Sequence, residues 1–289
     1  MSKGKILKIG YGKCFASFGE LAQGRLSNGS DFLITLPIDL WSICDLTCKS
    51  RNGKTTIKCK YEKSTEIAKK IVNDLGLDYG FDIEIKFLRS IPIGKGMSSS
   101  TADMISVYRA FQEVFGFIVT SEYLSKVFSE IEPHDGLMYK SCVGYDHRIG
   151  KLLSDFKYVP QFEIVAVDGG GTLDTLQYNQ NLLFSETHIS QYDILYESFT
   201  TAFANKDDKK IAKLALEATR LQFERTERKI LKYGLDEFEN LGASGVISTH
   251  SGTCVGFIFM PGENEKIKKA EDYIAEGSVL STKTLKFFG

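Results

Sequence analysis

Several features that define common protein classes are missing from this 289-residue chain. No apolar run approaches the roughly 18 residues of a membrane-spanning helix, so we expect no membrane partner. The segment MSKGKILKIG contains no long apolar stretch, which predicts a cytoplasmic protein without a signal peptide. The net charge is −1, and no Lys/Arg cluster is interleaved with aromatics. We therefore expect no nucleic-acid partner.

Signatures of disulfide and zinc chemistry are also absent. The six cysteines form no CxxC pair, and a chain of this length does not need disulfide staples. We expect reduced, mostly buried thiols. The four histidines show neither HExxH nor HxH spacing, which argues against a zinc site. What is present is a 43% hydrophobic composition with balanced charge, typical of a globular protein with a full core.

Hydrophobic periodicity predicts an α+β fold. The first 60 residues are rich in β-formers and carry no helical stripe, residues 81–88 alternate as a strand, and residues 162–168 resemble a buried strand. The pattern breaks near 150–160, which suggests a domain boundary there. Helical patterns cover residues 64–76, the segment after Ser98, 121–131, 190–205, 208–232 and 263–276.

The stretch IPIGKGMSSSTAD, residues 91–103, places a glycine-rich loop between a strand and a helix. Gly94 and Gly96 let the backbone approach a ligand, and the free N–H groups of a helix start favour an anion. Ser100 and Asp103 also fit a helix capping box. The residues alone leave phosphate binding and helix capping open. The P-loop pattern GxxxxGK[ST] occurs nowhere, and GxGxxG is absent from this stretch.

Two further stretches carry chemistry-bearing residues. SEIEPHDG places Glu132 and Asp135 around a proline, which suits metal binding and substrate activation or an acidic helix end. VDGGGT, residues 167–172, resembles a phosphate loop of the actin-like ATPases. The partner loops of that fold are missing from the sequence, so a tight turn after a strand is the better interpretation.

An ordered set of motifs resembles the GHMP kinases, a superfamily named for galactokinase, homoserine kinase, mevalonate kinase and phosphomevalonate kinase. Residues 92–102, PIGKGMSSSTA, resemble its second motif, PxxxGLGSSAA, with Ser98 in place of the inner glycine. SFGELAQG at 17–24 and THSGTCVG at 249–256 stand where the first and third motifs are expected. The stretches GELAQG, GKGMSSSTAD, IEPHDG and DHRIG look most like the L-threonine kinases of cobalamin biosynthesis.

This resemblance implies a two-domain GHMP kinase-like fold. Residues 1–155 are expected to form the ATP-binding, ribosomal protein S5 domain 2-like part, and residues 156–289 a ferredoxin-like part. ATP and Mg²⁺ are the implied cofactors, and a small hydroxy amino acid is the implied partner. The implied reaction makes O-phospho-L-threonine from L-threonine. Homoserine kinase is the enzyme alternative, and a nucleotide-binding protein without catalysis is the non-enzyme alternative.

The resemblance also assigns nucleotide and metal ligands. Ser99 and Glu132 are expected to hold Mg²⁺, with Glu130 as the alternative carboxylate, and Asp135 is expected to face the substrate hydroxyl as the catalytic residue. The residues expected around the nucleotide are Pro92, Gly94, Lys95, Gly96, Met97, Ser98, Ser99, Ser100 and Thr101.

Substrate-binding residues are expected near the first and third motifs. Glu20 and Asp39 are candidates for the ammonium group of the substrate, although either is also an ordinary polar strand residue. His250 and Gly252 are candidates from the third motif. The triplet at 146–148, Asp-His-Arg, either orients the pocket or forms a salt-bridged turn.

Overall fold

The computed structural model describes residues 7–170, 184–250, 252–274 and 279–286. Within these residues, ten strands form one sheet in the order β10-β7-β9-β8-β1-β2-β4-β3, and a hairpin of β5 and β6 joins it at β2. The strand pairs are antiparallel apart from β3 and β4, which run parallel. The α+β architecture expected from the periodicity is confirmed.

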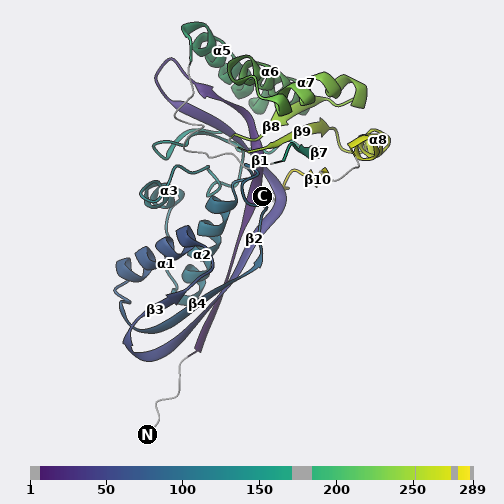
Figure 1. Ribbon diagram of the computed structural model, residues 1–289. Helices are drawn as coiled ribbons and strands as arrows, with labels where there is room; N and C mark the ends of the chain where they lie inside the picture. Colours follow the sequence, from purple (N-terminus) through teal and green to yellow (C-terminus); the bar gives the residue numbers. More distant parts are fainter. Residues whose placement is uncertain (1–6, 171–183, 251, 275–278, 287–289) are drawn as a thin grey trace.

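Two long strands, β1 (Leu7–Arg25) and β2 (Asp31–Lys54), run along the length of the molecule (Figure 1). β4 (Tyr79–Arg89) and the short β3 (Thr56–Lys58) extend the sheet beside β2. The helices α1 (Glu62–Asp74) and α2 (Ser99–Phe115) pack together, and α2 lies on β1 and β2. Alternate β2 residues are buried on one face of the sheet: Cys44, Leu46 and Cys48.

The other end of the sheet carries β8 (Gly245–Ser248), β9 (Cys254–Phe259), β7 (Glu163–Asp168) and β10 (Val279–Lys283). The helices α5 (Glu186–Ala204), α6 (Asp208–Thr226) and α7 (Lys229–Leu241) gather at this end, and α8 (Asn264–Ile274) lies beside β7 (Figure 1). A second apolar cluster lies between α6, α7, α8 and the strands β7–β9, with Val246, Phe257 and Phe259 fully buried in it.

A short hairpin and one helix complete the region around the candidate site. β5 (Val143–Asp146) pairs with residues 32–34 of β2, and β6 (Lys151–Asp155) pairs with β5. α3 (Ser121–Ser129) precedes the acidic segment at 130–136. The hairpin therefore brings the turn after β5 next to the start of β2, far away in sequence.

Three details differ from the sequence expectations. The helical pattern at 208–232 is two helices, because Glu227 takes a left-handed conformation with a φ of 49° between α6 and α7. The region near 150, expected to be a break, holds the β5–β6 hairpin. α1 begins at Glu62, two residues before the predicted start. One sheet crosses the predicted boundary at 155, and the boundary itself stays a prediction. No helix within the described ranges is both long and apolar enough to span a membrane.

Candidate active site

The start of α2 is arranged for something other than a capping box. Ser98 precedes the helix in the left-handed conformation, with a φ of 58°, and its side chain makes no capping hydrogen bond. The Asp103 carboxylate accepts a hydrogen bond from Ser42 at 2.5 Å instead of reaching back to the helix start. The capping-box interpretation of Ser100 and Asp103 is therefore wrong. A serine in this conformation costs about 1–2 kcal/mol, and such strain concentrates at functional sites.

The glycine-rich loop before α2 packs directly on the third-motif loop. A Cβ on Gly96 would lie 2.6 Å from the Thr249 Cβ, and one on Gly252 would lie 2.1 Å from the carbonyl oxygen of Lys95. Both positions therefore need glycine for this close backbone approach. Pro92 at the start of the loop is exposed, whereas Met97 at its end is buried. The second and third motifs form one continuous surface.

Lys95 ties this loop to the end of β7. Its ammonium lies 2.5 Å from the Asp168 carboxylate, which also accepts hydrogen bonds from Thr253 at 2.5 Å and from the Gly170 N–H at 3.0 Å. Although burial raises the pKa of Asp168, the hydrogen bonds from Lys95 and Thr253 hold that pKa below its usual range. The VDGGGT stretch thus turns tightly at 168–170 and contacts the loop; Gly171 and Thr172 lie outside the described residues.

Glu132 meets the start of α2 through Ser100. The Ser100 hydroxyl donates a hydrogen bond to one Glu132 oxygen, and the Lys63 ammonium of α1 pairs with the other. The hydroxyl on Glu132 is therefore that of Ser100, not that of Ser99, which begins α2 beside it. Glu130, the alternative metal ligand, pairs with Lys70 at 3.0 Å on the exterior.

Asp135 lies behind Ser98. The Ser98 hydroxyl donates to the Asp135 carboxylate and also shares a hydrogen bond with the hydroxyl of Ser17 from the first motif. Burial raises the pKa of Asp135, while the hydrogen bond from Ser98 and the imidazoles of His147 and His134 oppose that rise. The raised pKa makes the Asp135 carboxylate a stronger proton acceptor than an ordinary aspartate.

Glu20 lies close to Asp135 on an irregular part of β1. The register of β1 against β2 shifts between Ser17 and Glu20, and Gly19 in a left-handed conformation passes against the backbone of β8. Burial and the nearby Asp135 charge raise the pKa of Glu20 well above its ordinary value, and a hydrogen bond from the His250 backbone opposes that rise. One buried oxygen of Glu20 has no partner within the described residues.

Asp39 lies away from Glu20 and Asp135. It is exposed, accepts a hydrogen bond from the Trp41 indole at 2.8 Å, and lines an open groove with Glu163 and Lys283. The alternation of β2 places its side chain outside, whereas the irregularity of β1 turns Glu20 inward. Of the two predicted ammonium ligands, the fold brings only Glu20 to Asp135.

His250 is buried and hydrogen-bonded in the third-motif loop. Its Nδ1 donates to the Gln23 side-chain oxygen at 2.6 Å, and its ring lies 4.9 Å from that of His147. Burial holds the pKa of His250 well below its ordinary value, so the ring is neutral. Arg228 secures this loop by donating to the carbonyl oxygens of His250, at 3.3 Å, and of Gly252.

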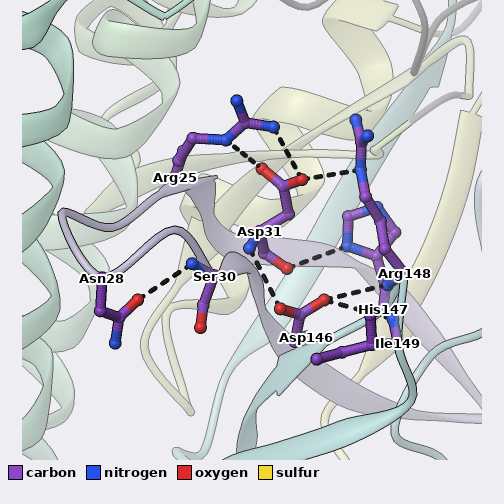
Figure 2. A network of polar contacts seen from close by, with 8 residues as sticks. All are labelled: Arg25, Asn28, Ser30, Asp31, Asp146, His147, Arg148 and Ile149. Atoms are coloured by element: carbon purple, nitrogen blue, oxygen red, sulfur yellow. Dashed lines mark hydrogen bonds and ion pairs between the residues drawn. The ribbon is translucent and has the colours of Figure 1, made fainter.

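Figure 2 shows that the triplet at 146–148 forms a salt-bridged turn against the start of β2. The Asp31 carboxylate is held by Arg25 at 2.8 Å and by Arg148 at 2.8 Å. The Asp146 carboxylate accepts backbone N–H groups of residues 31, 148 and 149. His147 donates from Nδ1 to the Asp31 carbonyl oxygen at 3.2 Å. The turn thus fixes the direction of the His147 ring.

Sequence reasoning missed several residues that complete the site. Lys63 belongs to an amphipathic helix, and Arg225 and Arg228 belong to a long helical pattern. Nothing in their local sequence separates these three from surface residues. Gln23 lies within the first-motif stretch, but the motif gave it no role of its own. Only the fold brings α1, β1 and the end of α6 to the same place.

The residues around Glu132 have the chemistry that Mg²⁺ prefers. A carboxylate and a serine hydroxyl lie side by side at a helix start, and Asp135 is close enough for the Glu132 charge to affect its pKa. No group of three or more His, Cys, Asp or Glu side chains suited to a metal is found in the part of the chain that the structure describes. Mg²⁺ commonly uses one or two carboxylates together with water and substrate phosphates, so this sparse set fits it.

Comparisons with known proteins find relatives of this sequence. Residues 62–144 match the family model of the GHMP kinases N terminal domain, which covers α1, the loop, α2 and the acidic segment. L-threonine kinase of Citrobacter freundii is 26% identical over 174 residues, and L-threonine kinase of Salmonella typhimurium is 24% identical over 201 residues. The matched regions span 58% and 67% of this chain but only 57% and 65% of those relatives.

Solved structures share the fold over nearly the whole chain. Mevalonate kinase from L. major, in complex with R-mevalonate, superposes with a TM-score of 0.71 at 15% identity. The superposed region covers 98% of this chain and 97% of the mevalonate kinase chain. Homoserine kinase from Cytophaga hutchinsonii superposes with a TM-score of 0.68 at 13% identity. The superposed region covers 96% of this chain and 95% of the homoserine kinase chain. Residues 62–144 therefore match the GHMP kinases N terminal domain model, and the whole chain has a fold similar to that of these two kinases.

Proposed function

We propose that this protein is a small-molecule kinase that transfers a phosphoryl group from MgATP to the side-chain hydroxyl of L-threonine, giving O-phospho-L-threonine for the nucleotide loop of cobalamin. The observation that carries the proposal is that the start of α2, where Ser98 makes no capping bond, brings Ser98 to Asp135 and Ser100 to Glu132. The family match to the loop and the acidic segment supports the reaction class. The two L-threonine kinases support the substrate.

The loop and the start of α2 are proposed to bind the ATP phosphates. The first N–H groups of a helix have no acceptor within the helix and carry its positive dipole end. Ser98 makes no capping bond, so no side chain competes for those N–H groups from the N-cap position. Lys95, Ser99, Ser100 and Thr101 supply a positive charge and hydroxyls around them.

Glu132 and Ser100 are proposed to hold the magnesium ion of MgATP. Bound there, Mg²⁺ would neutralise charge on the transferring phosphoryl group. Lys63 pairs with Glu132, so a positive charge stands at this carboxylate. Lys63 can therefore contribute positive charge near the ATP phosphates.

Asp135 is proposed to accept the proton of the threonine hydroxyl. Its raised pKa makes it a better proton acceptor than an ordinary aspartate, and Ser98 and the neighbouring imidazoles hold it in place. Glu20 is proposed to bind the substrate ammonium, because an unpartnered buried oxygen of this acid lies near Asp135. An ammonium there would favour the ionised form of Glu20.

The test is a steady-state assay of ADP formation with MgATP and a panel of alcohols. The panel holds L-threonine, L-homoserine, L-serine, mevalonate and galactose. We expect the highest kcat/KM with L-threonine. A clear preference for L-homoserine would replace the substrate and keep the reaction class. ADP formation with none of these alcohols by a folded, ATP-binding protein would favour a nucleotide-binding protein without catalysis.

A further inference from the structure

An aspartate at the end of β7 connects the two glycine-rich loops of the proposed nucleotide site. β7 belongs to the part of the sheet that carries α7 and α8, whereas the second-motif loop at 92–98 leads into α2, which lies on β1 and β2 (Figure 1). Asp168 is the last residue of β7 and lies opposite Cys254 of β9. Its carboxylate contacts the second-motif loop through Lys95 and the third-motif loop through Thr253.

Both oxygens of the Asp168 carboxylate hold hydrogen-bond donors. Oδ1 accepts from the Thr253 hydroxyl at 2.5 Å and from the Gly170 N–H at 3.0 Å, and Oδ2 lies 2.5 Å from the Lys95 ammonium. The Gly169 N–H also donates to the Thr253 carbonyl oxygen at 2.8 Å, so the turn after β7 is bound to the third-motif loop at two points. Burial opposes ionisation, but the bonds to the carboxylate outweigh it and hold the pKa of Asp168 below its usual range.

The ion pair between Lys95 and Asp168 is largely shielded from water. The two side chains are only 23% and 27% exposed. Salt screens partly buried charges much less than exposed ones, so the pair persists at ordinary ionic strength. A mobile lysine loses rotamer freedom when it binds a ligand, whereas a lysine that is already held has lost it beforehand. The pair therefore fixes a cation at the loop before an anion binds.

The backbone of Lys95 joins the two loops at a second place. A Cβ on Gly252 would lie 2.1 Å from the Lys95 carbonyl oxygen, so the two chains are in direct contact there. Arg228 donates to the Gly252 carbonyl oxygen and holds the third-motif loop against this contact. Any displacement of Lys95 therefore disturbs both loops.

We propose that Asp168 is a positioning residue for MgATP. It does not touch the nucleotide but holds the Lys95 ammonium, and through Thr253 the third-motif loop, in the arrangement that receives the phosphates. An ammonium carries three donor hydrogens, so holding a carboxylate does not prevent Lys95 from meeting a phosphate oxygen. This inference rests on the proposed function and adds to its nucleotide site a residue outside the three motifs. Asp168 of the VDGGGT stretch thus acts through Lys95 and not as part of a phosphate loop of its own.

The test is calorimetric titration of MgATP into the wild type and into Asp168→Asn. The amide keeps the shape of the side chain and can still accept the bonds from Thr253 and Gly170, but it lacks the charge that holds Lys95. We expect the Kd for MgATP to rise by about tenfold, the usual effect of losing one hydrogen bond to a charged group. In the kinase assay the KM for MgATP should rise by a similar factor, while kcat at saturating MgATP should change little.

A double-mutant cycle with Lys95→Met separates positioning from a general structural role. If Asp168 acts through Lys95, Asp168→Asn should raise the Kd for MgATP no further in the Lys95→Met protein. A structural role that does not involve Lys95 would raise the Kd by the same factor in both backgrounds, and that result overturns the inference.

Asp82→Asn is the matched control. Asp82 lies on β4 beside β3, away from both loops, and its contacts are of the same kind. It accepts a hydrogen bond from the Thr56 hydroxyl at 2.6 Å and pairs with Arg51 at 2.6 Å. Replacing it should leave the Kd for MgATP unchanged.

Thr253→Val is a second variant, which removes one bond to the Asp168 carboxylate and keeps the shape of the side chain. It should raise the Kd for MgATP by less than Asp168→Asn does, and only while Lys95 is present. It decides the matter if Asp168→Asn does not fold. An unchanged Kd in a folded Asp168→Asn protein overturns the inference and leaves the kinase proposal standing. A lower Kd also overturns it, because the carboxylate would then compete with the phosphates for Lys95.

The titration also separates this inference from the proposed function, since it needs no turnover. MgATP binding that weakens in Asp168→Asn supports the positioning role even if no alcohol is phosphorylated, although the kinase proposal would then be wrong. No binding of MgATP to the wild type overturns both.

Discussion

Replacing Asp135 by asparagine tests the proposed chemistry at one atom. The substitution keeps the shape of the side chain, and its amide oxygen can still accept the hydrogen bond from Ser98. It removes the proton acceptor, and positioned acid–base groups contribute about 10²- to 10⁴-fold to rate. We expect kcat to fall by that factor, equivalent to about 3–5 kcal/mol of transition-state stabilisation. ATP affinity should change little, because the phosphates are bound by the loop and the start of α2.

The pH dependence gives a second signature of the same residue. A base must be ionised to act, so activity should be lost as pH falls through the pKa of Asp135. An ordinary aspartate has a pKa of about 4. Because burial raises the pKa of Asp135, the acid limb of the activity profile should lie at a higher pH than that. The residual activity of Asp135→Asn should lack this limb. The assay is ADP formation with saturating MgATP and L-threonine from pH 5 to 9, with ATP binding measured separately by calorimetry.

The control is Asp39→Asn, which removes an exposed carboxylate outside the cluster and should leave kcat unchanged. If Asp135→Asn retains wild-type kcat and the wild-type acid limb, Asp135 is not the proton acceptor. A loss of ATP binding with a normal residual rate would instead make Asp135 a nucleotide-binding residue.

Three further predictions address the metal, the loop and the start of α2. Glu132→Gln should raise the Mg²⁺ concentration needed for half-maximal rate by about tenfold, the effect of losing one charge-assisted contact. Glu130→Gln changes an exterior ion pair and should leave that concentration unchanged. Both effects are measured by titrating the rate with Mg²⁺. Gly96→Ala should lower the free energy of unfolding in urea more than Gly116→Ala does. Both glycines have a φ of 73°, but only Gly96 lacks room for a Cβ. Asp103→Asn should stabilise the protein at pH 7 by up to about 3 kcal/mol, because burial raises the Asp103 pKa to about 6 and ionisation then destabilises the folded state.

The sign of the Asp103 effect is specific. A raised pKa in the folded state gives stability that is complete below the unfolded pKa and is lost as pH rises through the folded one. The advantage of Asp103→Asn should therefore vanish near pH 4. An advantage independent of pH would contradict the assignment. Equal destabilisation by the two alanine substitutions would show that Gly96 is needed only for its φ. A shift in Mg²⁺ dependence for Glu130→Gln would restore Glu130 as a metal ligand.

The sequence contained most of the fold and only part of the site. Alternation and helical periodicity are local, so β4, β7 and most helices could be predicted with errors of a few residues at their ends. The strands β1 and β2 were predicted only as one β-rich region, and α6 and α7 were predicted as one helix. Glu20 comes close to Asp135 because the register of β1 against β2 shifts at this point, and no local sequence pattern encodes that shift. The end of α6 reaches the site through the packing of α6 on β1 and β8, so Arg225 carried no local signal.

The contacts of the three neighbouring serine hydroxyls at the start of α2 could also not be predicted from the sequence. Ser98, Ser99 and Ser100 are chemically identical, and the direction of each depends on where the helix begins. The left-handed conformation of Ser98 turns its hydroxyl toward Ser17 and Asp135, and the first turn of α2 then directs Ser100 to Glu132. Asp39 shows the opposite case, since a plausible acid near the first motif lies on the outer side of β2.

The central claim is that the site at the start of α2 transfers a phosphoryl group to an amino-acid hydroxyl. The most direct measurement is ³¹P NMR of the wild-type protein incubated with MgATP and L-threonine. The account predicts a new phosphomonoester resonance that coincides with added O-phospho-L-threonine and grows in step with ADP. A spectrum showing only ATP, or ADP with inorganic phosphate and no phosphomonoester, would contradict it.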